Sequence, residues 1–139
     1  MCWVSNKAIK KIAERDFYVY KIGQVLWNST FISRCKYYHY VPKFHNIKIP
    51  LIVLTPCINV DLIQRGYHSY KWIAIDDSNP SERCLYLGNY DNALKEKLSL
   101  YEHCCIATFI VPKGAEYYEN ESGRIVSSDI IYTGKYTKL

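Results

Sequence analysis

The sequence predicts an α+β domain in which two or three short helices pack against an antiparallel or mixed β-sheet. Three observations indicate this class. Val, Ile, Tyr and Thr dominate several short runs, Gly and Pro separate those runs, and other segments carry apolar residues at helical spacing. The order of strands, a short helix, a strand, a helix and a closing meander suits an α+β domain better than a doubly wound parallel sheet. The 139 residues contain no repeat or long linker, so we expect a single domain, residues 1–139.

The closing third of the chain, residues 104–136, predicts a strand meander. An apolar run from Cys104 to Val111 is followed by an extended run from Ala115 to Tyr118. Glu119–Gly123 has the composition of a turn, and Arg124–Tyr136 is again rich in β-formers. Because β-branched and aromatic side chains suit a half-buried pleated surface, we expect at least two paired antiparallel strands here.

Three segments predict helices. From Ser5 to Glu14, apolar residues fall near one face and lysines take the other, and Ser5 can cap the first turn. Asn59 can cap a single turn over Val60–Gln64, and Asp91 can cap a helix of about ten residues over Asn92–Glu102. We expect these helices to cover one side of the sheet.

Earlier strands are predicted from alternation of apolar and polar residues. In the first of them, Lys21 falls on a face that is otherwise apolar, as expected for an edge position or for a cation directed into a pocket. The predicted strands before the meander are Asp16–Gly23, Thr30–Val41, Ile47–Leu54, Tyr67–Trp72 and Cys84–Leu87.

Charge and aromatic content favour an anionic partner. Residues 1–71 carry eleven Lys or Arg against three Asp or Glu, a net of +8, whereas residues 72–139 carry seven against ten, a net of −3. A basic half attracts a nucleotide, a nucleic acid or an acidic protein surface, and the acidic half argues against a uniform nucleic-acid coat. Of the 21 aromatic residues 14 are Tyr, whose ring with a polar tip suits recognition surfaces.

Several classes of chemistry lack their signatures. The six cysteines show no CxxC pair and no zinc-type spacing with histidine, so we expect no metal and reduced, buried thiols. No phosphate loop, dinucleotide-binding glycine motif, nucleophile elbow or HExxH occurs, and we expect neither a cofactor nor a catalytic residue. No basic leader and no apolar run of about 18 residues is present, which predicts a cytoplasmic protein without a membrane partner.

The stretch from Tyr67 to Trp72 is the best pocket candidate outside the meander. Its aromatic, cationic and polar-tipped side chains can stack on a base or donate to a phosphate. Neighbouring strand residues point to opposite faces, so either Tyr67 and Ser69 or His68 and Tyr70 can line a pocket, but not both pairs. We favour His68 and Tyr70. The expected ligand contacts are Lys21, Tyr67, His68, Ser69, Tyr70, Lys113, Arg124 and Asp129.

A turn offers backbone N–H groups to phosphate as well as its side chains. For that reason Lys113, in the turn after the apolar run, is expected to be a better phosphate partner than the strand cation Arg124.

Four short motifs resemble the mono-ADP-ribosyltransferase fold: Tyr20-Lys21, Gly66 to Ser69, Val111 to Ala115, and Ile125 to Ile131. The resemblance implies that Lys21 and Ser69 stand near two positions that surround NAD in that family. It places Ser127-Ser128-Asp129 where the family has its catalytic Glu. Because a Ser or a shorter Asp does not reach the same place, the implied site binds ADP-ribose without its catalytic acid.

The closing segment, Ile110 to Tyr132, is also similar to short proteins encoded by bacteriophages. Such proteins include anti-defence sponges, which bind nucleotide signals of host immunity such as cyclic ADP-ribose derivatives and cyclic oligonucleotides. The resemblance implies a non-enzymatic protein in the host cytoplasm. It would sequester such a signal without recognising a nucleic-acid sequence, as a monomer or as a homo-oligomer.

Two further hypotheses stand beside sequestration. One is an ADP-ribosyltransferase-like enzyme acting on NAD, with Asp129, Glu121 or Glu119 as its acid. The other is a protein-binding inhibitor that uses a Tyr-rich surface and takes no small ligand. Sequestration needs only affinity, so aromatic faces and cationic donors suffice for it.

Overall fold

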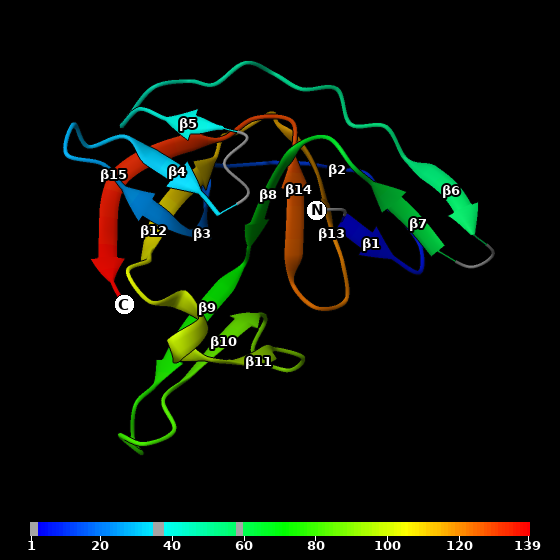
Figure 1. Cartoon of the computed structure of the whole chain (residues 1–139). Helices are drawn as coiled ribbons and strands as arrows, with labels where there is room; N and C mark the ends of the chain where they lie inside the picture. The colour runs from blue at the N-terminus through cyan, green and yellow to red at the C-terminus, as the bar shows by residue number, and fades with distance from the viewer. Residues whose placement is uncertain (1–2, 35–37, 58–59) are drawn as a thin grey trace.

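The computed structural model of the chain describes residues 3–34, 38–57 and 60–139. Within these ranges nearly all regular structure is β-strand, and every strand pair is antiparallel (Figure 1). The first strands are β1 (Trp3–Ser5), β2 (Lys11–Ile12), β3 (Phe17–Val25), β4 (Phe31–Ser33), β5 (His39–Tyr40), β6 (Leu54–Cys57), β7 (Val60–Ile63) and β8 (Tyr67–Tyr70). They are followed by β9 (Trp72–Asp76), β10 (Cys84–Gly88), β11 (Leu94–Lys97), the 3₁₀ turn η1 (Leu98–Tyr101), β12 (Cys105–Val111), β13 (Glu116–Glu119), β14 (Arg124–Ser127) and β15 (Ile131–Lys138).

The strands form one large sheet and two small ones. The large sheet runs β15-β12-β3-β8-β14-β13-β2, and β4 joins it at β3 and pairs in turn with β5. The small sheets are β1-β7-β6 and β11-β10-β9. None of the described residues forms a helix of the length and apolarity needed to span a bilayer.

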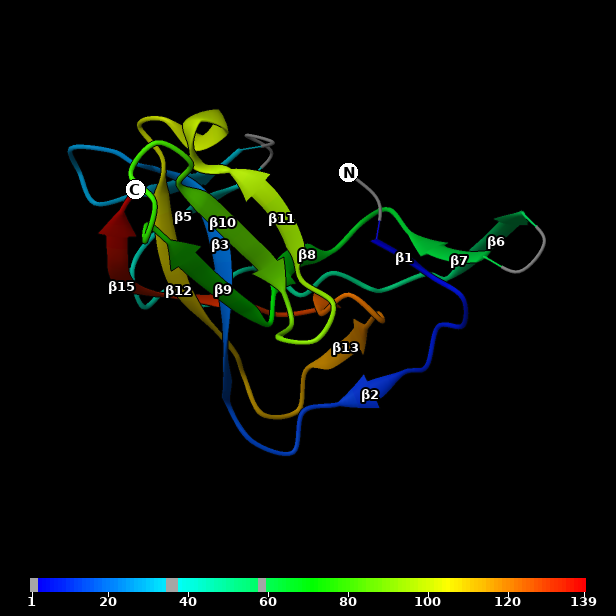
Figure 2. The same cartoon turned by 90° about the horizontal axis from the view of Figure 1, so that it is seen from below.

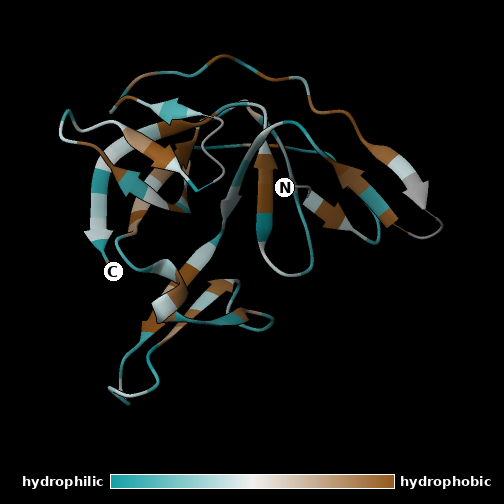
Figure 3. Cartoon of the chain, in the orientation of Figure 1, coloured by the Kyte–Doolittle hydropathy of each residue, from teal (hydrophilic) through white to brown (hydrophobic). Residues whose placement is uncertain are grey.

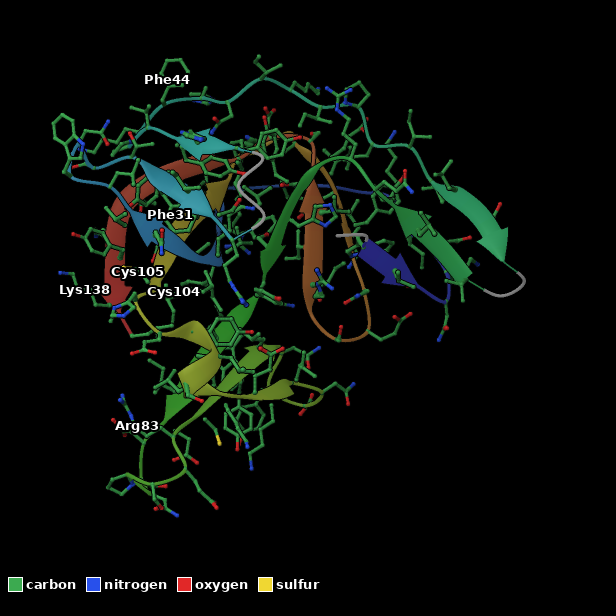
Figure 4. The ribbon with its side chains drawn as sticks, viewed as in Figure 1. Phe31, Phe44, Arg83, Cys104, Cys105 and Lys138 are labelled. Carbon is green, nitrogen blue, oxygen red and sulfur yellow. The ribbon has the colours of Figure 1, made fainter. Side chains whose placement is uncertain are left out.

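The main core is a cluster of aromatic rings. The ring of Phe31 on β4, labelled in Figure 4, lies 5.3 Å from the ring of Phe109 on β12 and 5.6 Å from that of Tyr132 on β15. All three side chains are fully buried. The segment after β5 closes over this cluster, because Lys43 N–H donates to Tyr132 O at 2.6 Å and His45 forms a bridge with Ile131. Each fully buried ring contributes roughly 1.5–3 kcal/mol of transfer free energy.

The other face of the large sheet carries a second core beneath the β9-β10-β11 sheet. Leu85 and Leu87 of β10 pack with Ile22 of β3 and Tyr101 of η1. Figure 2 shows this small sheet lying across β3 and β12, while β1, β6 and β7 extend to the side. The cleft described below lies where the second core meets the edge of the main one.

Trp3 anchors the β1-β7-β6 sheet to the large sheet. Its ring is fully buried with Ile63 and Val126, and its indole N–H donates to Arg124 O at 2.9 Å. The apolar indole ring is thus removed from water while its polar N–H keeps a hydrogen-bond acceptor.

The central strand β12 is a nearly continuous apolar run, and its residues alternate in burial. Along β12 every second residue is buried and the residues between are half-buried, since both faces of this central strand are covered. Figure 3 shows hydrophobic residues along β12 and β14 and hydrophilic residues in the loop that joins β9 to β10.

The expected α+β class, with two or three helices in an ADP-ribosyltransferase-like arrangement, is wrong. The Ser5–Glu14 segment forms part of β1 and the edge strand β2, and Ile9 and Ile12 are exposed. The backbone of Ala13 pairs with the turn before β13, since its N–H donates to Ala115 O at 2.9 Å and its carbonyl accepts from Gly114 N–H at 2.8 Å. Backbone pairing with a distant strand has overridden the helical spacing.

The other two helices are also absent from the described residues. Asn92–Glu102 splits into β11 and η1, with Leu94 exposed and only Leu98 and Tyr101 buried. The Val60–Gln64 turn is instead the strand β7, which pairs with β1, and its expected cap Asn59 lies outside the described residues. In both places an antiparallel neighbour takes the backbone hydrogen bonds that a helix would make internally.

Most strand predictions are confirmed. The meander is present as β12 to β15, with β13 and β14 paired from Tyr117↔Ser127 to Glu119↔Ile125 across the predicted turn. Thr30–Val41 holds two strands, β4 and β5, and its residues 35–37 lie outside the described ranges. Ile47–Leu54 is wrong as a strand, since it runs without regular pairing until Leu54 and joins the sheet through Ile49 N–H to Ser128 O at 2.9 Å.

Candidate functional site

A cleft opens where β3 exchanges one neighbour for another. β8 pairs with β3 through Tyr20↔Tyr70 alone, and from Gly23 onward the same edge of β3 pairs with β4. β8 and β4 therefore separate, and a cavity of about 1040 Å³ lies between them. We call it the central cleft. It is lined from β3, β4, β8, β11, η1 and β14, and from Tyr38 and the residues just before β8.

Lys21 lies at the point where the two strands separate. Its side chain is only 6% exposed, and its ammonium donates to the carbonyl of His68 on β8. The ammonium lies 5.3 Å from the ring centroid of Tyr40 and 5.9 Å from that of Phe109. A backbone acceptor and two ring faces together stabilise a cation that burial would otherwise disfavour.

Three arginines join Lys21 around the cleft. Arg34 follows β4, Arg65 precedes β8 and Arg124 begins β14, while Glu96 of β11 is the one acidic side chain among the lining residues. Four cations against one carboxylate give a formal net charge of +3. Opposed cations on the walls of a concave site favour an anionic ligand.

Two of these arginines are stacked on tyrosine rings. The Arg34 Cζ lies 4.5 Å from the ring centroid of Tyr101, and the Arg124 Cζ lies 5.7 Å from that of Tyr70. Tyr70 stands directly opposite both Arg124 of β14 and Tyr20 of β3, so these three share one face of the sheet. Burial raises the pKa of Tyr70, Arg124 and Arg34 act to lower it, and Glu96 acts to raise it.

His68 is a neutral histidine at pH 7. Burial lowers its pKa to about 4, and the positive charges of Lys21 and Arg124 act in the same direction. Its Nε2 lies 3.2 Å from Gln64 O, which requires the proton on Nε2. Its Nδ1 is then an acceptor, and it is buried without a hydrogen-bond partner among the described residues.

Ser69 is the second buried polar group at this site. It is 3% exposed, and its Oγ makes no hydrogen bond to a described residue. It occupies the face of β8 opposite to that of His68 and Tyr70, in keeping with the alternation that the sequence predicts. The favoured pair, His68 and Tyr70, lines the cleft, and Ser69 lines it as well.

The structure brings together five of the eight expected contacts: Lys21, His68, Ser69, Tyr70 and Arg124. It does not bring the other three to the cleft. Lys113 is exposed in the turn after β12, where its N–H donates to Asp16 Oδ1 at 2.7 Å. The expectation that Lys113 outranks Arg124 as a phosphate partner has no support in this placement.

Tyr67 and Asp129 also lie elsewhere. The Tyr67 ring belongs to the main core, and its hydroxyl donates to Ile47 O. Burial raises its pKa to about 12. Asp129 is half-buried in the connection between β14 and β15 and is not among the residues that line the central cleft.

The residues that sequence reasoning missed come from distant segments. Arg65 lies two residues before the Tyr67–Trp72 stretch, on the other side of Gly66, and composition of that stretch alone does not include it. Arg34 falls inside the predicted strand Thr30–Val41, and no local pattern distinguishes it. Glu96 and Tyr101 were placed in a helix, which put their side chains on the wrong elements.

A larger hollow of about 1490 Å³, the terminal groove, lies between η1, the start of β12 and the end of β15. Figure 4 labels Arg83, Cys104, Cys105 and Lys138 around it, and Cys105 pairs with Lys138. Four cations and three acids line it, and Tyr101 is the one Phe, Tyr or Trp among its described lining residues. Its balanced charge gives it less selectivity for an anion than the central cleft has.

The described cysteines show no metal-binding arrangement. Cys84, Cys104 and Cys105 are free thiols, and the described residues contain no group of three His, Cys, Asp or Glu side chains able to hold a metal ion. Burial raises the pKa of the Cys104 thiol, which keeps it protonated and unreactive at neutral pH.

Comparison of the chain with protein-family models, with curated proteins and with solved structures finds no match.

Proposed function

We propose that the protein sequesters an anionic, nucleotide-derived small molecule in the central cleft, without transforming it. The observation that carries the proposal is the convergence of Lys21, Arg34, Arg65 and Arg124 on one cavity with a single carboxylate, Glu96. Arg and Lys donate charge-assisted hydrogen bonds to phosphate oxygens, and a cavity of this volume accommodates a nucleotide-sized ligand.

The aromatic rings of the cleft support a nucleotide rather than a simple inorganic anion. Tyr38 is half-buried beside the Tyr67 ring, with a centroid distance of 5.2 Å, and lines the cleft. Stacking of a base on an aromatic ring contributes roughly 1–3 kcal/mol by analogy with single-stranded nucleic-acid binding. An immune signal such as a cyclic ADP-ribose derivative or a cyclic oligonucleotide carries both features, which is the basis for proposing a viral anti-defence role.

The positions of the acidic side chains favour binding over transferase chemistry. Glu119 lies 3.3 Å from the Lys71 ammonium, and Glu121 accepts from Ser5 Oγ at 2.8 Å. With Asp129, these are the three acids expected for an ADP-ribosyltransferase, and none of them lines the central cleft. A carboxylate outside the site cannot stabilise charge on a ligand within it.

Five tyrosines are not available as a protein-binding surface. Tyr40, Tyr67, Tyr101, Tyr118 and Tyr132 are buried and build the cores. A partner protein could use only the exposed rings, such as Tyr18, Tyr90 and Tyr136.

Isothermal titration calorimetry against ADP-ribose, NAD, AMP and cyclic di-AMP tests this function. We expect at least one to bind and to be recovered unchanged, as judged by mass spectrometry after incubation. Arg124→Gln should weaken the binding of that ligand by roughly tenfold or more. Arg15→Gln makes the same charge change at an exposed position outside the cleft and should have no effect. Silent titrations for every ligand, or turnover of NAD, would contradict the proposal.

A further inference from the structure

The two stacked arginines stand on separate walls of the central cleft, Arg34 after β4 and Arg124 at the start of β14. This inference rests on the proposed function. We infer that the cleft binds one ligand through two separate phosphate groups, one at the Arg34 guanidinium and one at the Arg124 guanidinium. The ligand class is a nucleotide with two phosphates linked through the sugar or in a ring, of which a cyclic dinucleotide is the simplest example.

The first phosphate position is at Arg34. The backbone of this residue is fixed to β3, since Arg34 N–H donates to Ile22 O at 3.3 Å. The side chain is exposed on the cleft, and its guanidinium lies over the ring of Tyr101, which is itself only 4% exposed. Stacking engages the face of a guanidinium and leaves its N–H donors pointing outward in the plane, where they match two oxygens of a phosphate.

The second position is at Arg124, on the wall of the cleft formed by β8 and β14. The Arg124 side chain is half-buried and lies over the Tyr70 ring, and the Arg124 backbone is paired with Tyr70 in the β8–β14 ladder. Both arginines line the same cleft as Tyr70, and both act electrostatically on its phenol.

Both rings that hold the arginines rest on the same support. Tyr101 is a member of the second core and Tyr70 packs against it, together with Ile22, Leu85 and Leu87. The spacing of the two cations is therefore set before a ligand arrives, which lowers the entropic cost of binding a ligand with matching spacing.

Charge agrees with two phosphates. The lining residues carry a formal net of +3, and two phosphodiesters bring about −2, so a bound cyclic dinucleotide would leave a net of about +1, the sum of Lys21, Arg65 and Glu96. A single phosphomonoester has about the same charge but places it at one point. It would place that charge at one of the two guanidinium groups and not at the other.

Cyclic di-AMP and AMP separate these cases. Near neutral pH both carry a charge of about −2, but cyclic di-AMP carries it on two phosphates and AMP on one. For cyclic di-AMP we expect Arg34→Gln and Arg124→Gln each to weaken binding by roughly 10- to 100-fold, and the double variant by the product of the two factors. For AMP we expect only one of the two substitutions to matter. The inference is overturned if cyclic di-AMP responds to only one substitution, or if AMP responds as strongly to both.

Three controls complete the experiment. Arg34→Lys and Arg124→Lys keep the charge but lose the planar fork, so each should weaken cyclic di-AMP binding, and they replace the Gln variants if those fail to fold. Arg15→Gln should leave the affinities for cyclic di-AMP and for AMP unchanged. Binding of AMP or ADP-ribose without binding of cyclic di-AMP would refute two-phosphate recognition and leave the proposed function standing. If none of ADP-ribose, NAD, AMP and cyclic di-AMP binds, both the two-phosphate inference and the proposed function are refuted.

Discussion

The backbone of Gly88, at the end of β10, crosses the backbone of Gly123, in the turn before β14. A Cβ built on Gly88 would lie 1.9 Å from Ser122 O, and one built on Gly123 would lie 2.4 Å from the carbonyl carbon of Gly88. Both residues have positive φ, +118° and +79°. Beside them, Lys71 N–H donates to Gly123 O at 2.9 Å. This crossing fastens the β9-β10-β11 sheet to the large sheet.

Gly88→Ala should destabilise the fold by roughly 2 kcal/mol or more. The Cβ would occupy the position of a backbone oxygen, and the φ of +118° is strained for any residue with a side chain. Urea unfolding followed by tryptophan fluorescence measures the loss. Gly114→Ala is the matched control, because Gly114 has φ +90° but nothing within 4 Å of an added Cβ, so it isolates the backbone cost. Equal losses for the two variants would show that the crossing is not as close as described.

Gly23→Ala should destabilise the protein by roughly 1–3 kcal/mol and disturb the main core. An added Cβ would lie 2.0 Å from Ile32 O and 2.7 Å from the Phe31 ring, so β4 could no longer approach β3. Urea unfolding gives the free energy, and near-ultraviolet circular dichroism reports the aromatic cluster. Gln24→Ala, at an exposed position in the same strand, should change neither signal appreciably. An unchanged dichroism spectrum for Gly23→Ala would contradict the close approach.

Lys21→Met should lower stability by about 1–3 kcal/mol, because it leaves the buried carbonyl of His68 without its donor while retaining most of the apolar stem. The substitution should also weaken the binding of an anionic ligand in the central cleft. The free energy of unfolding and calorimetric affinity are the two readouts. Lys113→Met removes the same charge from an exposed turn and should alter neither. A Lys21→Met protein with native stability and native affinity would rule out both roles.

The pKa of His68 predicts a loss of stability in mild acid. The native pKa is about 4, below the unfolded value of 6.5, so between these values the unfolded chain binds the proton that the native state excludes. The contribution of His68 to the free energy of unfolding is therefore complete above pH 6.5 and falls as the pH drops towards 4. From pH 7.5 to pH 5 it amounts to about 2 kcal/mol.

Urea unfolding at the two pH values measures this change in the native protein and in His68→Gln, in which the slope attributable to His68 should vanish. His103→Gln serves as the control, since the His103 side chain is 83% exposed. A slope that persists in His68→Gln would assign the pH dependence to other groups.

The sequence predicts the strands well because their signal is local. The apolar, β-forming run from Cys104 to Val111 and the turn composition of Glu119–Gly123 are visible without knowledge of neighbours, and both are confirmed by β12 and by the β13–β14 pair. The helix over Asn92–Glu102 fails for the opposite reason. Leu94, Leu98 and Tyr101 have helical spacing, but β10 offers Leu94 and its neighbours a ladder of backbone hydrogen bonds. Spacing of side chains cannot reveal which distant strand will claim the backbone.

The site is predicted in part for the same reason. Lys21 and the His68–Tyr70 pair were selected because each is unusual within its own strand, and they do line one cleft. Arg34 and Arg65 reach that cleft only because β3 changes its neighbour, and this is a long-range property of the sheet. Lys113 was selected from turn composition alone, which indicates donors but not their distance from the other groups.

The path of β3 has a consequence for how this protein could diverge. The gap between β8 and β4 arises because the main chain of β3 changes its pairing partner from β8 to β4 at Gly23. The side chains that line the gap do not produce it. Rim residues such as Arg34 and Arg65 are exposed and can be exchanged with little cost to folding. Descendants that keep the glycine could therefore acquire new ligands rapidly while their architecture stays the same.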